Sequence, residues 1–250
     1  MGDTTRGDGG AVILVSGGMD SATAVYEAME RGCEPYFLHV SYGQQTENRE
    51  YECARALAGE VGAADFLGVE TAHLSAVGNS SLTDEEVAVD DADLESEAVP
   101  DSYVPFRNAN LLSMAVSYAE ASGCSAVFVG AHSEDYSGYP DCRPAFFEAF
   151  RRVVDVGTRP DTDLEVVAPF VEWSRVDVVE RGLELGVPYE TTWSCYRNET
   201  PACGRCDACT ERYMRAGNKP CEPLYEFSKE RVYQTLLSPG LPSSSRIRAT

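Results

Sequence analysis

The sequence has very little lysine, since Lys219 and Lys229 are the only lysines among its 20 basic residues. With 41 acidic residues the formal net charge is −21, and a field of this sign repels the phosphate backbones of DNA and RNA. The composition therefore argues against a general nucleic-acid binder. Any phosphate chemistry must use arginine, metal ions or backbone amides. High acidity with scarce lysine also predicts a protein from a salt-rich cytoplasm, because strong negative charge keeps a chain soluble there.

Long apolar runs are also missing. No run approaches the ~18 apolar residues that span a bilayer, which excludes an integral membrane protein. The first ten residues, MGDTTRGDGG, hold no apolar signal segment, and the nine cysteines do not pair off evenly. We therefore expect a reducing, cytoplasmic location. The 43% hydrophobic and 24% charged residues are typical of an ordinary globular protein of 250 residues.

Short apolar runs alternate with amphipathic segments through the first 190 residues. The pattern predicts strands at 11–15, 36–40, 65–69, 126–129 and 165–168, and helices at 21–31, 47–61, 110–121, 145–154 and 174–185. This alternation is typical of an α/β fold with a doubly wound, Rossmann-like parallel sheet. We predict one such domain over residues 1–190.

Two segments interrupt or follow this alternation. The stretch 71–103 is predicted to be a solvated acidic loop or a lid, because residues 84–101 include nine Asp or Glu and no Lys or Arg. Beyond residue 190 the spacing between Cys, Gly, Pro and Arg becomes short. We predict a metal-binding helical segment over 191–237, which contacts the first domain, and a flexible tail over 238–250.

The string SGGMDS at 16–21 joins the first predicted strand to the first helix. At this edge of a parallel sheet the glycines, the helix amides and the macrodipole favour an anion. Asp20 would then need a cation such as Mg²⁺ between itself and a phosphate. A glycine-rich turn with a helix cap is the alternative.

This string resembles the pyrophosphatase loop of ATP enzymes that adenylate an oxygen atom and release pyrophosphate. The resemblance implies catalytic roles for Ser16 and Asp20. It further implies an ATP-binding set of Val15, Ser16, Gly17, Gly18, Met19, Asp20, Ser21, Ala22, Thr23, Ala24 and Val25.

Four cysteines near the end of the chain have metal-ligand spacing: Cys195, Cys203, Cys206 and Cys209. Four neighbouring thiolates repel one another unless a soft cation neutralises them, and tetrahedral Zn²⁺ does this. Because four sulfurs leave no position for water, we predict one structural zinc per chain. A redox pair and an iron–sulfur cluster are the alternatives. The other cysteines are predicted to be small buried hydrophobic residues: Cys33, Cys53, Cys124, Cys142 and Cys221.

Two polar clusters are predicted to grip a flat heterocycle by stacking and hydrogen bonds. They are YVPFRN at 103–108, before a helix, and DYSGYPDCR at 135–143, after the fourth strand. An ordinary loop with a helix cap is the alternative for each. His132 follows the same strand and is a further candidate, whereas His39 is predicted to be a core residue. The candidate substrate contacts are Arg107, Asn108, Asp135, Tyr139, Asp141 and Arg143.

Taken together, SGGMDS, SYGQ at 41–44, VPFRN, DYSGYPDCR and the WSC and CGRCDAC strings resemble the QueC family of 7-cyano-7-deazaguanine synthases over almost the whole chain. The resemblance implies an ATP-dependent ligase that converts 7-carboxy-7-deazaguanine and ammonia into the nitrile preQ0, through acyl adenylate and amide intermediates. AMP and pyrophosphate are released. It also implies bound zinc, Mg²⁺-dependent adenylation, homodimers and a place in archaeosine or queuosine synthesis, of which a halophilic archaeon favours archaeosine.

Other functions fit the same loop. A tRNA thiolase or an amidotransferase synthetase would share it, but a tRNA enzyme should carry a basic face and a catalytic cysteine pair. A nucleotide-binding module without catalytic activity is the alternative from another class. No glutaminase segment is evident, so free ammonia is the expected nitrogen source.

Overall fold

The structure, a computed structural model, describes residues 9–78, 80–84, 87–91, 99–133, 139–197 and 200–214. Its centre is a five-stranded parallel sheet in the order β3-β2-β1-β4-β5. All five strands coincide with predicted ones to within a few residues, which confirms the parallel sheet. The strands are β1 (Gly10–Leu14), β2 (Glu34–Ser41), β3 (Asp65–Glu70), β4 (Ala126–Phe128) and β5 (Glu165–Val167).

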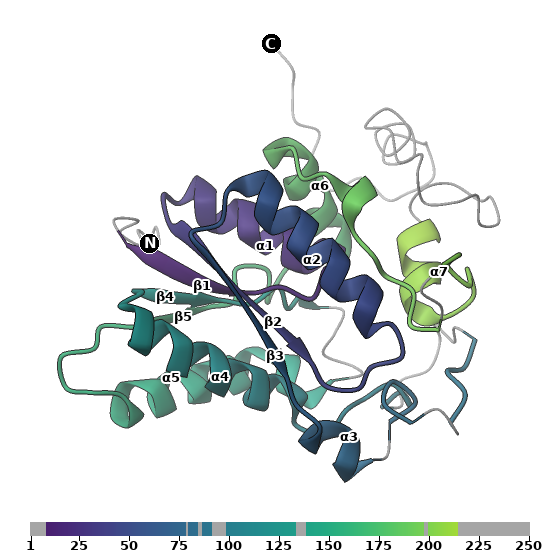
Figure 1. The fold of residues 1–250 in the computed structure, drawn as a ribbon, viewed down its shortest axis with the longest axis horizontal. Coiled ribbons are helices and arrows are strands. Elements are labelled where there is room, and N and C mark those ends of the chain that lie inside the picture. The colour runs from purple at the N-terminus through teal and green to yellow at the C-terminus, as the bar shows by residue number, and fades with distance from the viewer. Residues whose placement is uncertain are drawn as a thin grey trace.

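Helices cover both faces of the sheet. Figure 1 shows α1, α2 and α6 on one face and α4 and α5 on the other, so the doubly wound arrangement is also confirmed. Short 3-10 turns lie at Pro140–Cys142 and Tyr189–Thr191. The helices are α1 (Met19–Glu30), α2 (Glu47–Val61), α3 (His73–Val77), α4 (Arg107–Ser122), α5 (Pro144–Gly157), α6 (Arg175–Leu185) and α7 (Asp207–Met214).

The central strand β1 explains why the first apolar run is continuous. Ala11 and Ile13 pack into the core under α1, α2 and α6, whereas Val12 packs into the core under α4. Successive side chains of a strand point to opposite faces, so a strand with helices on both sides is apolar at every position.

The strand order reverses at β1, because the chain continues to β2 on one side and later to β4 on the other. Ligands of open parallel sheets bind outside the carboxyl ends of the strands at such a point. Gly130, just after β4, lets the start of α1 come close, since a Cβ there would lie 2.6 Å from the carbonyl oxygen of Asp20. The fold thus brings the loop after β1 against the end of β4.

The acidic stretch differs from its prediction. It contains α3, and Leu74 and Leu82 are buried with Tyr42 and Val104 in a small cluster. The prediction of a solvated loop is therefore wrong for these residues. Two leucines eight positions apart give no periodic signal, so only the tertiary contacts reveal them. Residues 79, 85–86 and 92–98 lie outside the described part.

The segment that holds the four terminal cysteines, described at residues 191–197 and 200–214 and called the cysteine-bearing segment below, packs beside α2. Cys53 of α2 joins Trp193 and three of the terminal cysteines in one buried cluster. Arg212 of α7 is buried and donates to the hydroxyls of Thr192 and Ser194 and to the carbonyl oxygen of Tyr189. The rest of the predicted segment and the predicted tail, residues 215–250, lie outside the described part. Of the helices that the structure describes, none combines the length and the apolar character needed to cross a bilayer.

Candidate active site

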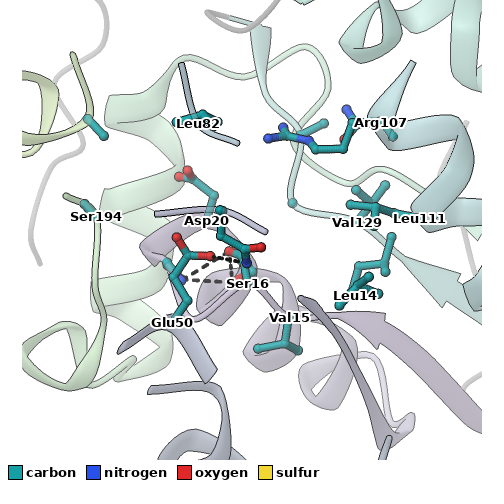
Figure 2. A pocket seen from close by; sticks show the side chains of 18 of the residues that line it. Leu14, Val15, Ser16, Asp20, Glu50, Leu82, Arg107, Leu111, Val129 and Ser194 are labelled. Carbon is teal, nitrogen blue, oxygen red and sulfur yellow. Dashed lines mark hydrogen bonds between the residues drawn. The ribbon is translucent and has the colours of Figure 1, made fainter. Parts of the chain in front are cut away.

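A cavity of about 250 Å³ opens at the carboxyl ends of the central strands. Its walls come from the loop after β1, the loop after β2, the starts of α2, α4 and α6, and the cysteine-bearing segment. Figure 2 shows Asp20 and Ser16 on one side of this cavity and Arg107 on the other. The two predicted sites, for a phosphate and for a heterocycle, are therefore parts of one cavity.

The loop after β1 has the geometry of an anion site. Gly17 has a φ of +87°, and a Cβ there would lie 2.4 Å from the carbonyl oxygen of Glu50, so only glycine fits. No side chain caps the start of α1 at Gly18. The Ser21 hydroxyl donates to the Gly18 carbonyl at 3.0 Å, and the Ser16 Oγ lies 3.2 Å from that of Ser21. Backbone and hydroxyl groups at this end thus face the cavity without a capping carboxylate.

Asp20 lies in the first turn of α1 and lines the cavity. Its Oδ2 is 3.7 Å from Nε2 of His132 and 3.9 Å from Nη1 of Arg175. Its Oδ1 is buried and has no hydrogen-bond partner among the described residues. A carboxylate oxygen that has no hydrogen-bond partner, beside an anion site, fits the demands of Mg²⁺, which prefers oxygen ligands.

Arg175, at the start of α6, is a cavity residue that sequence analysis missed. Its side chain is 12% exposed and faces Asp20. Together with Arg107 it provides the arginines that the scarcity of lysine led us to expect. The signal was available, because the predicted helix at 174–185 follows a strand whose carboxyl end lies on the same edge.

Arg107 and two tyrosines form the other end of the cavity. Nη1 of Arg107 donates to the phenol oxygen of Tyr42 at 3.2 Å, and its guanidinium carbon lies 6.0 and 5.9 Å from the ring centroids of Tyr42 and Tyr139. The Tyr139 hydroxyl is 2.8 Å from that of Ser102. Two aromatic rings and a planar cation can hold a flat polar ring.

The remaining predicted substrate contacts divide into three groups. Asp141 accepts from the backbone amide of Asn108 at 2.8 Å, and Nδ2 of Asn108 donates back to the Asp141 carbonyl at 3.2 Å. This pair holds the start of α4, and only Asn108 lines the cavity. Arg143 is exposed at the start of α5 and does not line the cavity. Asp135 lies outside the described residues.

Part of the predicted ATP-binding set belongs to the core. Ala22, Ala24 and Val25 pack into the core cluster, and the Thr23 hydroxyl donates to the Met19 carbonyl and bonds the Tyr189 hydroxyl. None of these four lines the cavity, and neither does Gly17. The members that line it are Val15, Ser16, Gly18, Met19, Asp20 and Ser21.

Glu50, in the first turn of α2, is a second cavity residue that sequence analysis missed. Its carboxylate accepts from the Thr46 hydroxyl at 2.7 Å and from Nε2 of Gln44 at 3.0 Å. Burial raises the pKa of this carboxyl, against the hydrogen bonds and the charge of Arg107. In sequence the residue is one acid among several on an amphipathic helix, so nothing distinguished it.

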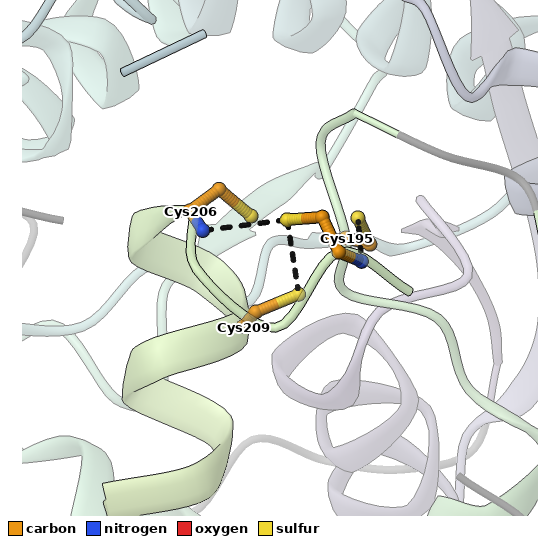
Figure 3. Close-up of side chains that lie close together, drawn as sticks. Cys195, Cys206 and Cys209 are labelled. Atoms are coloured by element: carbon orange, nitrogen blue, oxygen red, sulfur yellow. Dashed lines mark hydrogen bonds between the residues drawn. The ribbon is translucent and has the colours of Figure 1, made fainter. Parts of the chain in front are cut away.

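The four terminal cysteines form one cluster, with their sulfurs within 4.8 Å of one another. Backbone amides of Arg197 and Cys203 donate to the Cys195 sulfur at 3.4 and 3.2 Å, and those of Arg205 and Cys206 to the Cys203 sulfur at 3.4 Å each. Figure 3 shows this arrangement around Cys195, Cys206 and Cys209. Thiol donation from Cys206 and Cys209 lowers the pKa of Cys195.

These sulfurs are compatible with a zinc site. Tetrahedral Zn–S bonds of ~2.3 Å require sulfurs somewhat under ~4 Å apart, so a small contraction of the cluster is enough. Backbone N–H groups that point at sulfur favour the thiolate form that a metal needs. Of the other cysteines, Cys33, Cys53, Cys124 and Cys142 are buried, as predicted, and Cys221 lies outside the described residues.

The cluster and the loop after β1 are joined directly. The backbone amide of Trp193 donates to the Gly17 carbonyl at 2.9 Å. The guanidinium carbon of Arg49 lies 5.2 Å from the centroid of the Trp193 ring, and the indole Nε1 of Trp193 donates to the Cys195 carbonyl oxygen at 3.1 Å. Trp193, Ser194 and Ala208 line the cavity, so the cysteine-bearing segment forms one of its walls.

Comparison with known proteins decides the family. Residues 10–217 match the family model of the queuosine biosynthesis protein QueC. The chain belongs to the QueC family. This match runs from β1 through α7 and therefore includes both ends of the cavity and the four cysteines.

Curated members of the QueC family resemble the chain over most of their length. The 7-cyano-7-deazaguanine synthase of Haloarcula marismortui is 64% identical over 93% of this chain and 99% of that protein. The synthase of Halobacterium salinarum is 68% identical over 89% and 97%, and that of Methanoculleus marisnigri is 52% identical over 81% and 91%. The first two are from halophiles, in agreement with the salt-rich habitat that the composition predicts. The structure of NMN synthetase from Francisella tularensis gives a TM-score of 0.45 at 14% identity, over 90% of this chain and 83% of that one.

Proposed function

We propose that this QueC-family chain converts 7-carboxy-7-deazaguanine and ammonia into 7-cyano-7-deazaguanine with ATP. The observation that carries the proposal is the single cavity, which joins an uncapped helix start at Gly18 to the aromatic and cationic end at Arg107. The reaction needs both, because the carboxylate of a flat heterocycle must meet the α-phosphate of ATP. The names of the relatives agree with it.

At the phosphate end, the amides at the start of α1, the hydroxyls of Ser16 and Ser21 and the guanidinium of Arg175 would bind the ATP phosphates. Asp20 would hold Mg²⁺ through Oδ1, which has no hydrogen-bond partner in the described structure. When bound, Mg²⁺ neutralises the charge that develops on the phosphates. Asp20 and Ser16 are the residues that we propose as catalytic.

At the heterocycle end, Tyr42 and Tyr139 would stack on the deazaguanine ring and Arg107 would hold its carboxylate or carbonyl oxygen. Asn108 contributes by fixing the start of α4 through its bonds to Asp141. This arrangement would turn the substrate carboxylate toward the phosphate end and exclude water from the reacting atoms.

The chemistry needs positioning and electrostatics more than a covalent nucleophile. A carboxylate is a poor acceptor for ammonia because its oxygen leaves badly, so it first becomes an acyl adenylate and pyrophosphate departs. Ammonia then gives the amide. A second adenylation on the amide oxygen allows AMP to leave and the nitrile to form, so one turnover consumes two ATP by this scheme.

The four cysteines would hold one structural zinc, which keeps the cavity wall at Trp193 in place. Free ammonia as nitrogen source, a homodimer and a cytoplasmic location remain predictions. The nitrile would supply the synthesis of a modified tRNA base, archaeosine or queuosine.

The experiment is a product assay with the full chain, ATP, Mg²⁺, 7-carboxy-7-deazaguanine and ammonium. We expect the nitrile, AMP and pyrophosphate to form only when both the acid and ATP are present. A binding module would bind ATP and form no AMP, and a tRNA-modifying enzyme would form AMP only with tRNA. Either result would replace the proposed function.

A further inference from the structure

We propose that Glu50 binds ammonium in the cavity and takes its proton during amide formation, an inference that rests on the function proposed above. Only two of the described residues that line the cavity are acidic, Asp20 and Glu50. Asp20 lies at the phosphate end, where its carboxylate is within 4 Å of His132 and Arg175. We have already proposed that it binds Mg²⁺ there. Glu50 is therefore the cavity carboxylate that is left for the nitrogen.

The reaction needs such a group. At neutral pH dissolved ammonia is almost entirely ammonium, which has no lone pair for attack. Conversion of ammonium and acyl adenylate into amide and AMP releases two protons. One must leave before the attack, and the other leaves the C–NH₃⁺ adduct. The nitrogen lone pair forms the C–N bond, and AMP departs with the electrons of the broken C–O bond. Glu50 would take the proton that must leave ammonium before the attack and pass it to water, whereas the strongly acidic adduct loses its own proton directly to water.

The hydrogen bonds of Glu50 leave room for ammonium. One carboxylate oxygen accepts from the Thr46 hydroxyl at 2.7 Å and the other from Nε2 of Gln44 at 3.0 Å. Each carboxylate oxygen has a second lone pair. Within the described part of the chain, no ion pair within 4 Å uses the charge of Glu50. Two neutral donors thus fix the carboxylate without neutralising it.

Glu50 lies beside the phosphate loop and is linked to the other end of the cavity through Gln44 and Tyr42. Its carbonyl oxygen contacts the backbone of Gly17, in the phosphate loop. On the other side, Gln44 accepts from the Tyr42 amide at 2.8 Å, and the Tyr42 phenol contacts Arg107. Figure 2 shows Glu50 on the same side as Ser16, across from Arg107. The acyl carbon must lie where the two ends meet.

The charged surroundings suit a base. Burial raises the pKa of Glu50, as does the nearby Glu47, while Thr46, Gln44 and Arg107 lower it. A carboxyl whose pKa moves toward the working pH is a better general base than an exposed one. Arg107 keeps the ionised form accessible.

The test separates the two half-reactions in Glu50→Gln. ATP–pyrophosphate exchange with 7-carboxy-7-deazaguanine, without a nitrogen source, measures adenylation alone, and we expect it to stay within about threefold of wild type, since it needs no base at nitrogen. Amide formation from ammonium should fall by about 10²–10⁴-fold. Hydroxylamine is uncharged at neutral pH, so the variant should still form the hydroxamate at close to the wild-type rate.

Three outcomes would overturn the inference. Amide formation from ammonium could persist in Glu50→Gln, the exchange could fall together with it, or hydroxylamine could fail as ammonium does. The second would make Glu50 a substrate-binding or structural residue. Glu60→Gln, exposed near the far end of the same helix and outside the cavity lining, is the matched control and should change neither half-reaction.

Failure of the proposed function would look different. Wild type itself would then show no exchange with the carboxylate substrate, whatever residue stands at position 50. Thermal unfolding of Glu50→Gln checks that the variant is folded. If it is not, Glu50→Asp, which keeps the charge on a shorter side chain, should keep adenylation and show a smaller, ammonium-specific loss.

Discussion

The loop after β1 and the cysteine-bearing segment line the same cavity but are stabilised in different ways. The loop continues a strand that is buried on both faces, and the Val15 amide extends the ladder by donating to Leu38 at 2.9 Å. The cysteine-bearing segment has a small core of its own, in which three of the four clustered cysteines are buried beside Trp193. The loop after β1 is therefore stabilised by apolar burial in the sheet, whereas we expect the cysteine-bearing segment to be stabilised by the metal that its sulfurs bind.

This difference means that the two regions should depend on each other unequally. The Trp193 amide donates a hydrogen bond to the Gly17 carbonyl, which holds the cavity wall and the loop together at that point. A fault in the sheet should disturb both regions, whereas loss of the metal should open the wall and leave the sheet folded. Four experiments test whether the two regions are stabilised differently, and we expect the greatest change in the cysteine-bearing segment.

Cys206→Ser should have the largest effect, because it removes one ligand of the expected zinc. Structural zinc contributes about 10–16 kcal/mol of apparent binding free energy in small zinc-finger peptides, and the small core around Trp193 offers no substitute. We expect metal content near zero and fast amide exchange over 193–214, with β1 still protected. Metal analysis and hydrogen exchange read by mass spectrometry measure both.

The control for this experiment is Cys33→Ser, which alters a buried thiol outside the cluster and should keep the metal. Bound iron with visible absorbance in wild type would refute zinc. Full protection of 193–214 in a metal-free variant would show that the segment is stabilised as the sheet is.

Asp20→Asn should reduce turnover by about 10²–10³-fold, the cost of losing one charge-stabilising group in an active site. The fold should be unaffected, because Oδ1 of Asp20 has no hydrogen-bond partner in the described structure. Turnover and thermal unfolding are the two measurements. Glu30→Gln, exposed at the far end of α1, should change neither. Retained turnover in Asp20→Asn would remove the magnesium role.

Gly17→Ala should destabilise the protein by about 1–3 kcal/mol, because alanine is strained at positive φ and a Cβ would clash with the Glu50 carbonyl. Gly59→Ala is the matched control, since Gly59 is exposed inside α2 and an added methyl group would have no atom within 4 Å. It should stabilise by about 0.5–1 kcal/mol. Denaturant unfolding measures both, and equal effects would contradict the close approach at Gly17.

His39 should give the smallest effect, a pH dependence of stability on the sheet side. Burial lowers the pKa of His39 below 6.5, and its Nδ1 lies 2.8 Å from the Val15 carbonyl oxygen. The unfolded chain therefore takes up a proton at a higher pH than the folded one. The contribution of His39 to the free energy of unfolding is fully present above pH 6.5. It is lost as the pH falls below this value, by at most ~1.4 kcal/mol per pH unit.

His39→Gln should remove this part of the pH dependence while it keeps a donor near Val15. The measurement is the free energy of unfolding between pH 7 and pH 5 for the variant and for wild type. Identical slopes in the two proteins would show that His39 is not the group that titrates.

Much of the fold was predictable because its signals are local. The strand at 11–15 and the helix after it differ by only a few residues from β1 and α1, since continuous apolar runs and 3.6-residue periods report burial directly. The start of α4 at Arg107 was missed by three residues, because its first turn is held by Asp141, which is distant in sequence. Leu74 and Leu82 were missed for the same reason.

The residues of the candidate site likewise divide into those with a local signal in the sequence and those without one. The glycines, Asp20 and the four cysteines could be found from spacing, because each set acts within one short stretch of chain. Glu50 could not, since it looks like an ordinary acidic residue near a helix start, whereas Arg175 could have been inferred from the helix start that follows the fifth strand. Asp141 and Arg143, which were predicted as substrate contacts, are not among the residues that line the cavity.

Hydrophobic periodicity, glycine and cysteine chemistry operate over a few residues, so they are enough to predict the parallel sheet, the anion-binding turn and four thiols spaced for a metal. Only the tertiary structure places Glu50 in one cavity with Asp20, Arg107 and Arg175, and makes Trp193 part of its wall. Those side chains come from five separate parts of the chain, and only the order of the strands brings their carboxyl ends to the same edge.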